Sequence, residues 1–221
     1  MMTNLFSAFD PSTSMNFSMN WMSSILFLFL MPCSFWLMPS RYSMIFKNIN
    51  MNMYLEFKLL LLNNSYLSVM FISLFLLIMF NNMLGLLPYV FTSSSHLTMT
   101  LSMALPMWLS IMLFGWLEKT QSMLAHSIPD GSPPILMPFM VCIETISNLI
   151  RPMALAVRLT ANMIAGHVMM SLIGEKMTAI SMFMLVILLV QLILMLFELG
   201  VAMVQALVFS TLTIMYSSEV A

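Results

Sequence analysis

Long apolar runs, separated by short polar stretches, organise the chain. Residues 21–38 are long enough to cross a bilayer once, and Pro32 inside them predicts a kink. Residues 66–87 form a second run, which Pro88 closes, and residues 97–117 form a third. We therefore expect three single membrane spans in the first part of the chain.

Two other stretches are more polar. Residues 40–62 mix basic and acidic side chains with Met, Ile, Phe and Leu, a pattern that suits a helix lying on the membrane surface. A connecting loop is the alternative interpretation of this segment. Residues 118–134 are polar and rich in proline, and they predict a loop.

The last two apolar segments, residues 135–173 and 178–216, are twice as long as a simple span requires. As helices each would extend roughly 58 Å, against a hydrocarbon core of about 30 Å. Either each segment breaks into two spans, or each lies strongly tilted. Pro152 offers a bend in the first, whereas Gly200 is the nearest candidate for a break in the second. We favour two long, tilted helices that form a hairpin.

The composition narrows the class of protein. Hydrophobic residues make up 61% of the chain and charged residues 7%, whereas a soluble domain has about 25% charged residues. The sequence thus predicts an all-α integral membrane protein with residues 1–221 in a single domain, comprising about five membrane-embedded helices and one surface helix. The net charge of −1 argues against nucleic acid as a partner. We expect Cys33 and Cys142 to be small buried hydrophobic residues.

The basic residues predict an orientation. If the amino terminus lies outside, four basic residues fall on the inner side: Arg41, Lys47, Lys58 and Lys119. Only Lys176 then falls outside. Because basic residues concentrate in inner loops, we expect the carboxyl terminus inside and the turn of the final hairpin outside.

Polar residues recur along both long segments. In the first, five of them share one helical face, since their spacings are seven or four residues: Glu144, Asn148, Arg151, Arg158 and Asn162. In the second, three repeat every seven residues: Gln191, Glu198 and Gln205. His167 points the opposite way from Arg158. Each of these groups needs a partner, because an unsatisfied polar group in lipid costs several kcal/mol.

Two interpretations of these polar faces stand side by side. The groups could bond to one another and only fasten the helices together. Alternatively, Glu and His could carry protons, while Arg158 acts as a fixed positive charge because a guanidinium does not deprotonate. Glu144 and Arg151, seven residues apart, can pair only loosely. We therefore expect the carboxylate that faces Arg158 to belong to another subunit.

Other classes of function remain as alternatives. Arg158 could bind an anionic substrate in a secondary transporter, or the chain could be a structural membrane subunit. No stretch matches G-x-x-x-x-G-K-[ST], so the chain is not expected to bind ATP, and no His/Cys/Asp cluster has metal-site spacing. We expect no cofactor.

Several stretches resemble subunit a of the mitochondrial F-type ATP synthases, in its arthropod versions. The resemblance covers essentially the whole chain. It is carried by RPMALAVRLTANMIAGH (151–167), IETISN (143–148), FELGVAMVQALVF (197–209) and, nearer the amino terminus, MTNLFSAFDPS, WLMPSRY and NNMLGLLPY.

The resemblance implies a proton-translocating stator subunit that is not an enzyme on its own. It implies a ring of c subunits, a peripheral stalk and other membrane-sector subunits as partners, in the mitochondrial inner membrane. The amino terminus would then lie in the intermembrane space and the carboxyl terminus in the matrix. Protons would pass through two offset half-channels to and from the ring carboxylates, and Arg158 would separate the half-channels.

The resemblance also implies roles for individual residues. It pairs Arg158 with Gln205, His167 with Glu198 and Glu144 with Glu219, around one turn near residues 181–182. The outer half-channel would contain His167, Glu198, Asn162 and Gln205, and the inner one Glu144, Asn148 and Glu219. Asn162 could instead satisfy local backbone. We expect Arg151 to be an inner-side anchor, and His96 and His126 to be solvated.

Overall fold

The computed structural model describes residues 5–14, 17–32, 37–61, 66–128, 133, 135–179 and 184–220. Every regular element in these ranges is a helix. Four helices are long and apolar enough to cross a membrane, and a shorter apolar stretch covers Met19–Leu30. The all-helical membrane architecture expected from the sequence is therefore present.

The amino-terminal part contains only short helices. The 3₁₀ helix η1 covers Leu5–Phe9, η2 covers Met19–Ile25, and the α-helix α1 covers Phe27–Leu30. Of the span expected over 21–38 with a kink at Pro32, the structure describes short helices up to Leu30, and residues 33–36 lie outside the described part. Met31 is extended at φ −64° and ψ 124°, because the ring of the following Pro32 disfavours the helical conformation of the residue before it.

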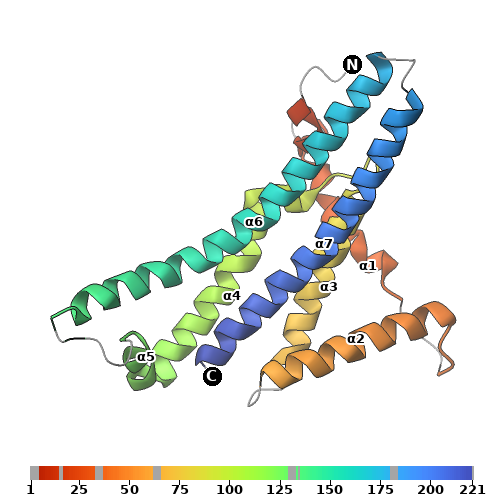
Figure 1. The fold of residues 1–221 in the computed structure, drawn as a ribbon. Helices are drawn as coiled ribbons and strands as arrows, with labels where there is room; N and C mark the ends of the chain where they lie inside the picture. The colour runs from red at the N-terminus through yellow and green to blue at the C-terminus, as the bar shows by residue number, and fades with distance from the viewer. Residues whose placement is uncertain are drawn as a thin grey trace.

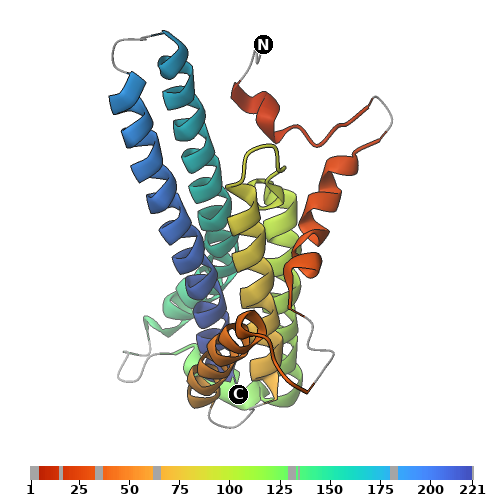
Figure 2. The ribbon, with the colours of Figure 1, turned by 90° about the vertical axis from the view of Figure 1, so that its right-hand side faces the viewer.

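Residues 40–62 hold a helix, α2 (Arg41–Leu60), rather than an irregular loop. Ser40 caps it by accepting a hydrogen bond from the Ser43 backbone N–H. Its Phe57 is buried against α3. Helix α2 lies across one end of the molecule, at a large angle to the other helices (Figures 1 and 2).

Helix α3 (Leu67–Gly85) packs against α7, and α4 (Leu97–Glu118) packs against α6. The two are joined through the 3₁₀ helix η3 (Ser93–Ser95). A short helix, α5 (Thr120–His126), lies inside the segment 118–134 that was predicted to be a loop.

The two long helices are α6 (Met137–Ala179) and α7 (Met184–Val220). At 43 residues, α6 is about 64 Å long, about twice the thickness of the hydrocarbon core of a bilayer. The first part of α6 runs at an angle to the rest (Figure 1); Pro152, which lacks a backbone N–H, lies inside it. Gly200 interrupts nothing, because α7 is continuous through it. The turn predicted near 181–182 lies outside the described residues.

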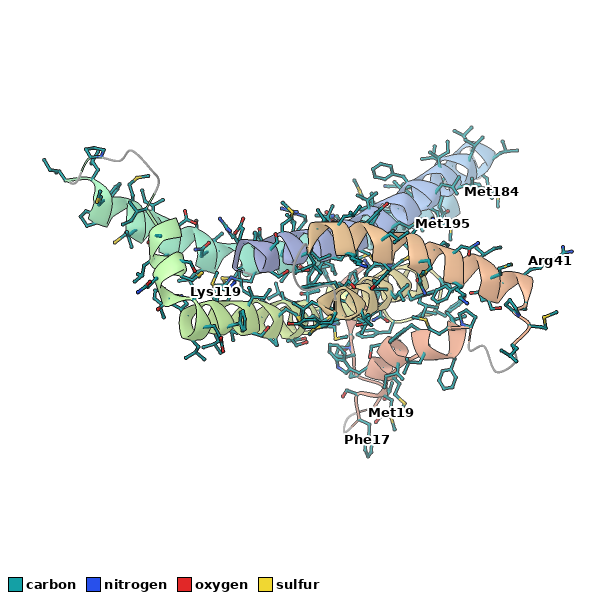
Figure 3. The ribbon with its side chains drawn as sticks, turned by 90° about the horizontal axis from the view of Figure 1, so that it is seen from below. Phe17, Met19, Arg41, Lys119, Met184 and Met195 are labelled. Atoms are coloured by element: carbon teal, nitrogen blue, oxygen red, sulfur yellow. The ribbon has the colours of Figure 1, made fainter. Side chains whose placement is uncertain are left out.

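One core joins these helices. Aromatic and aliphatic side chains of α2 and α3 meet small residues of the long helices, among them the fully buried Ala156 and Ala206. The hairpin extends beyond α3 and α4 at the other end (Figure 2). There the first half of α7, from Met184 past Met195, is exposed (Figure 3).

Candidate functional site

Polar side chains connect α6 and α7 at successive levels of the hairpin. Gly166, Asn162 and Arg151 of α6 face Glu198, Gln205 and Glu219 of α7, respectively. The order along α6 is the reverse of the order along α7, as antiparallel helices require. The recurring polar positions of the sequence therefore lie along the contact between the two long helices.

Arg158 occupies the middle of this series. Its side chain is exposed, and in the described part of the chain no hydrogen bond or ion pair reaches its guanidinium. Three alanines on the same side of α6 are also exposed: Ala154, Ala161 and Ala165. The small side chains around Arg158 leave room for another helix to approach it closely.

Asn162, one turn after Arg158, donates a hydrogen bond of 3.1 Å from its side-chain nitrogen to Gln205 Oε1. Gln205 is buried and Asn162 is half-buried. The alternative that Asn162 satisfies local backbone is not what the geometry shows. Gln205 thus bonds to Asn162, one turn from Arg158, and in the described part of the chain no hydrogen bond joins it to Arg158.

Glu198 lies against the backbone of Gly166, next to His167. A Cβ atom added to Gly166 would be 2.9 Å from Glu198 Oε1 and closer still to Oε2 and Cδ. The absence of a side chain at Gly166 is what allows the carboxylate to lie there. Glu198 and His167 therefore share one level of the hairpin.

The amino-terminal segment around Phe9 packs against the hairpin at the level of Glu198 and His167. The Phe9 ring meets the His167 ring edge-on, with the centroids 6.1 Å apart, and His167 Nε2 is buried with no hydrogen-bond partner among the described residues. The Phe9 carbonyl accepts a 2.8 Å hydrogen bond from His96 Nε2. His96, expected to be solvated, instead lies between Phe91 and Trp21, each 5.2 Å away between ring centroids.

The turn after Phe9 is built on Asp10. Its Oδ1 accepts hydrogen bonds from the Ser12 backbone N–H at 3.1 Å and from the Ser12 hydroxyl at 2.8 Å. These two bonds, the backbone bond first, lower the pKa of the Asp10 carboxyl below its ordinary value. Asp10 is therefore ionised wherever this turn is formed at neutral pH.

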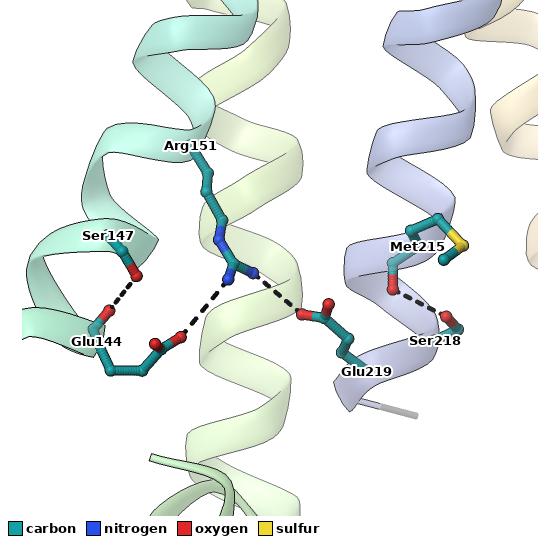
Figure 4. A network of polar contacts seen from close by, with 6 residues as sticks. All are labelled: Glu144, Ser147, Arg151, Met215, Ser218 and Glu219. Atoms are coloured by element: carbon teal, nitrogen blue, oxygen red, sulfur yellow. Dashed lines mark hydrogen bonds and ion pairs between the residues drawn. The ribbon is translucent and has the colours of Figure 1, made fainter. Parts of the chain in front are cut away.

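At the other end of the hairpin, Arg151 bridges two carboxylates (Figure 4). Its Nη2 lies 3.5 Å from Glu144 Oε1, and its Nη1 lies 3.1 Å from Glu219 Oε2. The guanidinium carbon is also 5.0 Å from the centroid of the Tyr216 ring. Of these two ion pairs the one to Glu144 is the longer, and only the one to Glu219 is also a hydrogen bond. The 3.5 Å distance agrees with the expectation that Glu144 and Arg151 pair only loosely.

A cavity of about 470 Å³ adjoins this bridge, between α4, α5, α6 and α7. Besides the three charged residues, its walls include Asn148, Trp108 and Trp116. The Trp108 indole N–H is buried without a hydrogen-bond partner in the described part of the chain. Asn148, which was expected beside Glu144, therefore lines the same cavity as Glu144.

No group of three or more His, Cys, Asp or Glu side chains in the described ranges could hold a metal ion. Cys142 is free and exposed, which corrects the expectation of a buried residue. Cys33 and the side chain of His126 lie outside the described part.

Sequence patterns single out most of this site but not all of it. The expected pairs Glu144–Glu219 and His167–Glu198 occupy common levels, although Arg151 rather than a direct contact joins the first pair. Phe9 and Trp108 were not expected at the site, since one aromatic residue in an apolar chain carries no signal. The seven-residue spacing of Glu144 and Arg151 was the available signal for the bridge.

Comparisons with known proteins agree with this architecture. Residues 17–218 match the family described as ATP synthase A chain. Curated relatives named ATP synthase subunit a are 57% identical in Anopheles gambiae, 56% in Aedes aegypti and 56% in Drosophila melanogaster, with all of this chain and all of each relative covered. This chain therefore belongs to the ATP synthase A chain family.

Proposed function

We propose that this chain is the proton-translocating stator subunit of the membrane sector of a mitochondrial ATP synthase, with Arg158 as its essential cation. The observation that carries the proposal is that Arg158 lies exposed, without a partner in the described part of its own chain, halfway along the polar contact of a membrane hairpin. A permanent charge at bilayer depth is expensive. Its carboxylate partner then comes from the neighbouring c-subunit ring.

The polar residues of α6 and α7 on either side of Arg158 act as the two half-channels. On the outer side, His167 and Glu198 pass a proton toward the ring, and Asn162 and Gln205 line this half-channel. On the inner side, Glu144, Asn148 and Glu219 receive the proton that the ring releases. Arg158 lies about 10 Å along α6 from Arg151 and about 13 Å from His167, so it separates the two ends.

Arg158 couples the proton path to rotation by electrostatics. A ring carboxylate that approaches the guanidinium is stabilised in its charged form, so its proton leaves toward the inner side. The next carboxylate takes a proton from the outer side and can enter lipid as a neutral group. Each proton that crosses supplies about 2.3 kcal/mol per 100 mV of membrane potential. The chain itself contributes no nucleotide chemistry.

The positions of the basic residues support an orientation. Helix α2, the end of α4 and the carboxyl terminus lie at one end of the molecule, and the end of α6 lies at the other (Figure 1). The basic residues on the first three elements are Arg41, Lys47, Lys58 and Lys119, whereas Lys176 is in the last turn of α6. This asymmetry favours the carboxyl terminus in the matrix and the amino terminus in the intermembrane space.

The test replaces Arg158 in the assembled complex. Arg158→Ala should leave the complex assembled on native gels but abolish ATP synthesis driven by a proton gradient. Lys176→Ala, which removes an exposed positive charge from the same helix, serves as the matched control and should retain synthesis.

A cysteine at position 161, one turn from Arg158, should form cross-links with a small ring subunit. Continued synthesis by Arg158→Ala would refute the proposal. Loss of uptake of an anionic solute with synthesis intact would instead identify a transporter.

A further inference from the structure

A cavity lies between α4 and the hairpin, beside the inner-side residues Glu144, Asn148 and Glu219 of the proposed proton path. With a volume of about 470 Å³, it has room for on the order of ten water molecules. Its walls offer groups that bind water: the side chains of Thr145 and Asn148 and the charged groups of Arg151, Glu144 and Glu219.

The cavity and the Arg158 face lie on different sides of α6. Thr145 and Leu149 line the cavity together with Trp108 and Trp116 of α4, so they point toward α4. Ala154 and Ala161, beside Arg158, are exposed on the other side of the helix. A ring that contacts Arg158 would therefore not cover the cavity.

Arg151 lies where the cavity and the face of α6 that carries Arg158 meet. It lines the cavity, and it shares a helical face with Arg158, because seven residues are close to two turns. Its guanidinium cannot release a proton, so the two carboxylates that it bridges are held in place by a charge that does not titrate. Two carboxylates against one guanidinium leave this wall of the cavity with an excess of negative charge, which attracts protons.

We propose that Arg151 is a positioning residue that holds Glu144 and Glu219 together where a water-filled vestibule, behind the hairpin, meets the face that carries Arg158. This inference rests on the proposed function and deepens it, because it assigns the inner aqueous end of the proton path to the α4 side of α6. Protons released by the ring reach the two carboxylates and leave through the vestibule. Arg151 acts through these carboxylates and does not itself carry protons.

The first test changes Arg151 in the intact complex. Arg151→Met removes the charge but keeps most of the volume, and we expect the rate of ATP synthesis per assembled complex to fall about tenfold, as the loss of a charge-assisted bond implies. Arg151→Lys keeps the charge but not the two-pronged geometry, so its rate should lie between those of Met and Arg. A residue that only anchored α7 would change the amount of complex on native gels. Equal rates per complex in all three forms would overturn the positioning role.

The second test asks whether the cavity holds water, and it does not depend on the Arg151 variants folding. In a background without Cys33 and Cys142, Asn148→Cys is compared with Ile146→Cys, whose parent side chain is 56% exposed away from the cavity. A membrane-impermeant thiol reagent applied from the matrix side should modify position 148 at least about tenfold faster, because thiolates form in water and not in lipid.

The outcomes separate this inference from the proposed function. Equal labelling at positions 146 and 148 would overturn the vestibule, even if Arg158→Ala abolishes synthesis. Labelling of position 148 only from the opposite side of the membrane would overturn its assignment to the inner end. Fast labelling from the matrix side, together with full synthesis by Arg158→Ala, would refute the proposed function and with it the role of Arg151 in proton exit.

Discussion

The side-chain amide of Asn162 donates a 3.1 Å hydrogen bond to the amide oxygen of Gln205. This bond joins α6 to α7 one turn away from Arg158 and turns Gln205 Oε1 toward Asn162. In the described part of the chain Gln205 bonds to Asn162 and not to Arg158, whose guanidinium is left available for a partner outside the chain.

The Asn162–Gln205 bond predicts non-additive effects of mutation. Asn162→Ala and Gln205→Ala each remove the same interaction, so the double variant should be little worse than either single variant. The coupling expected for a bond between membrane helices is about 0.6 kcal/mol. It can be measured as the difference in ATP synthesis rate across the four combinations in membrane vesicles. Strictly additive losses would show that the two side chains do not interact in the working complex.

Gly166→Ala should displace the Glu198 carboxylate. The added methyl group would overlap Glu198 Oε2 and Cδ, and the flexible end of the side chain can rotate away at little cost in stability. We expect normal amounts of assembled complex with at least about a tenfold lower synthesis rate, since proton transfer requires hydrogen-bond geometry. Gly174→Ala is the matched control, because a Cβ there meets no atom within 4 Å. Equal rates for the two variants would contradict the placement of Glu198.

The amino-terminal turn should loosen in acid. The hydrogen bonds from Ser12 lower the pKa of the Asp10 carboxyl, so the turn is fully stabilised above the ordinary value of 3.8 and loses this stabilisation as the pH falls through the lowered value. Brief proteolysis with an acid-active protease, from the side that the proposed orientation gives the amino terminus, should cut the segment faster as the pH is lowered. Asp10→Asn has no charge to lose at this position. The rate at which its turn is cut should therefore change with pH only as far as the activity of the protease itself does.

Ala206→Leu should prevent normal packing of α7. Ala206 is fully buried in the shared core, and inserting extra methylene groups into a packed core costs about 1–3 kcal/mol. We expect less assembled complex on native gels and a lower melting temperature. Ala206→Ser keeps the volume and can donate to a backbone carbonyl one turn earlier, as Ser210 does to Leu207, so it should assemble normally. Equal assembly of both variants would show that the site has unfilled space.

The apolar pattern predicted the long helices well because, in lipid, a backbone can satisfy its hydrogen bonds only within a helix. Helices α3 and α4 begin and end within two residues of the expected spans. At residues 21–38 the kink expected at Pro32 is matched by the extended Met31, whereas total hydrophobicity gave no signal for the 3₁₀ conformation of η2. It also missed α5, since a seven-residue helix in a polar segment has no apolar period to detect.

The site was predictable where geometry follows from helical spacing. Residues seven apart share a face, so Arg158, Arg151 and Glu144 could be grouped before any coordinates. The positions of Phe9 and Trp108 could not, because both join segments far apart in the sequence. That of Phe9 depends on how the amino terminus folds back, and that of Trp108 on how α4 packs against the hairpin. The direction of Gln205 was equally hidden: spacing places an amide at a level of the hairpin but does not choose its partner.

The exposed first half of α7 has a consequence for how the subunit is made. From Met184 to Phe197 nearly every side chain is apolar and unburied, so in water this segment would aggregate, whereas in a bilayer it needs no protein neighbour. The nascent chain must accordingly enter the membrane as it leaves the ribosome. Once inserted, this apolar half needs no neighbour, whereas the exposed guanidinium of Arg158 in the other helix of the hairpin stays costly in lipid until an opposite charge meets it.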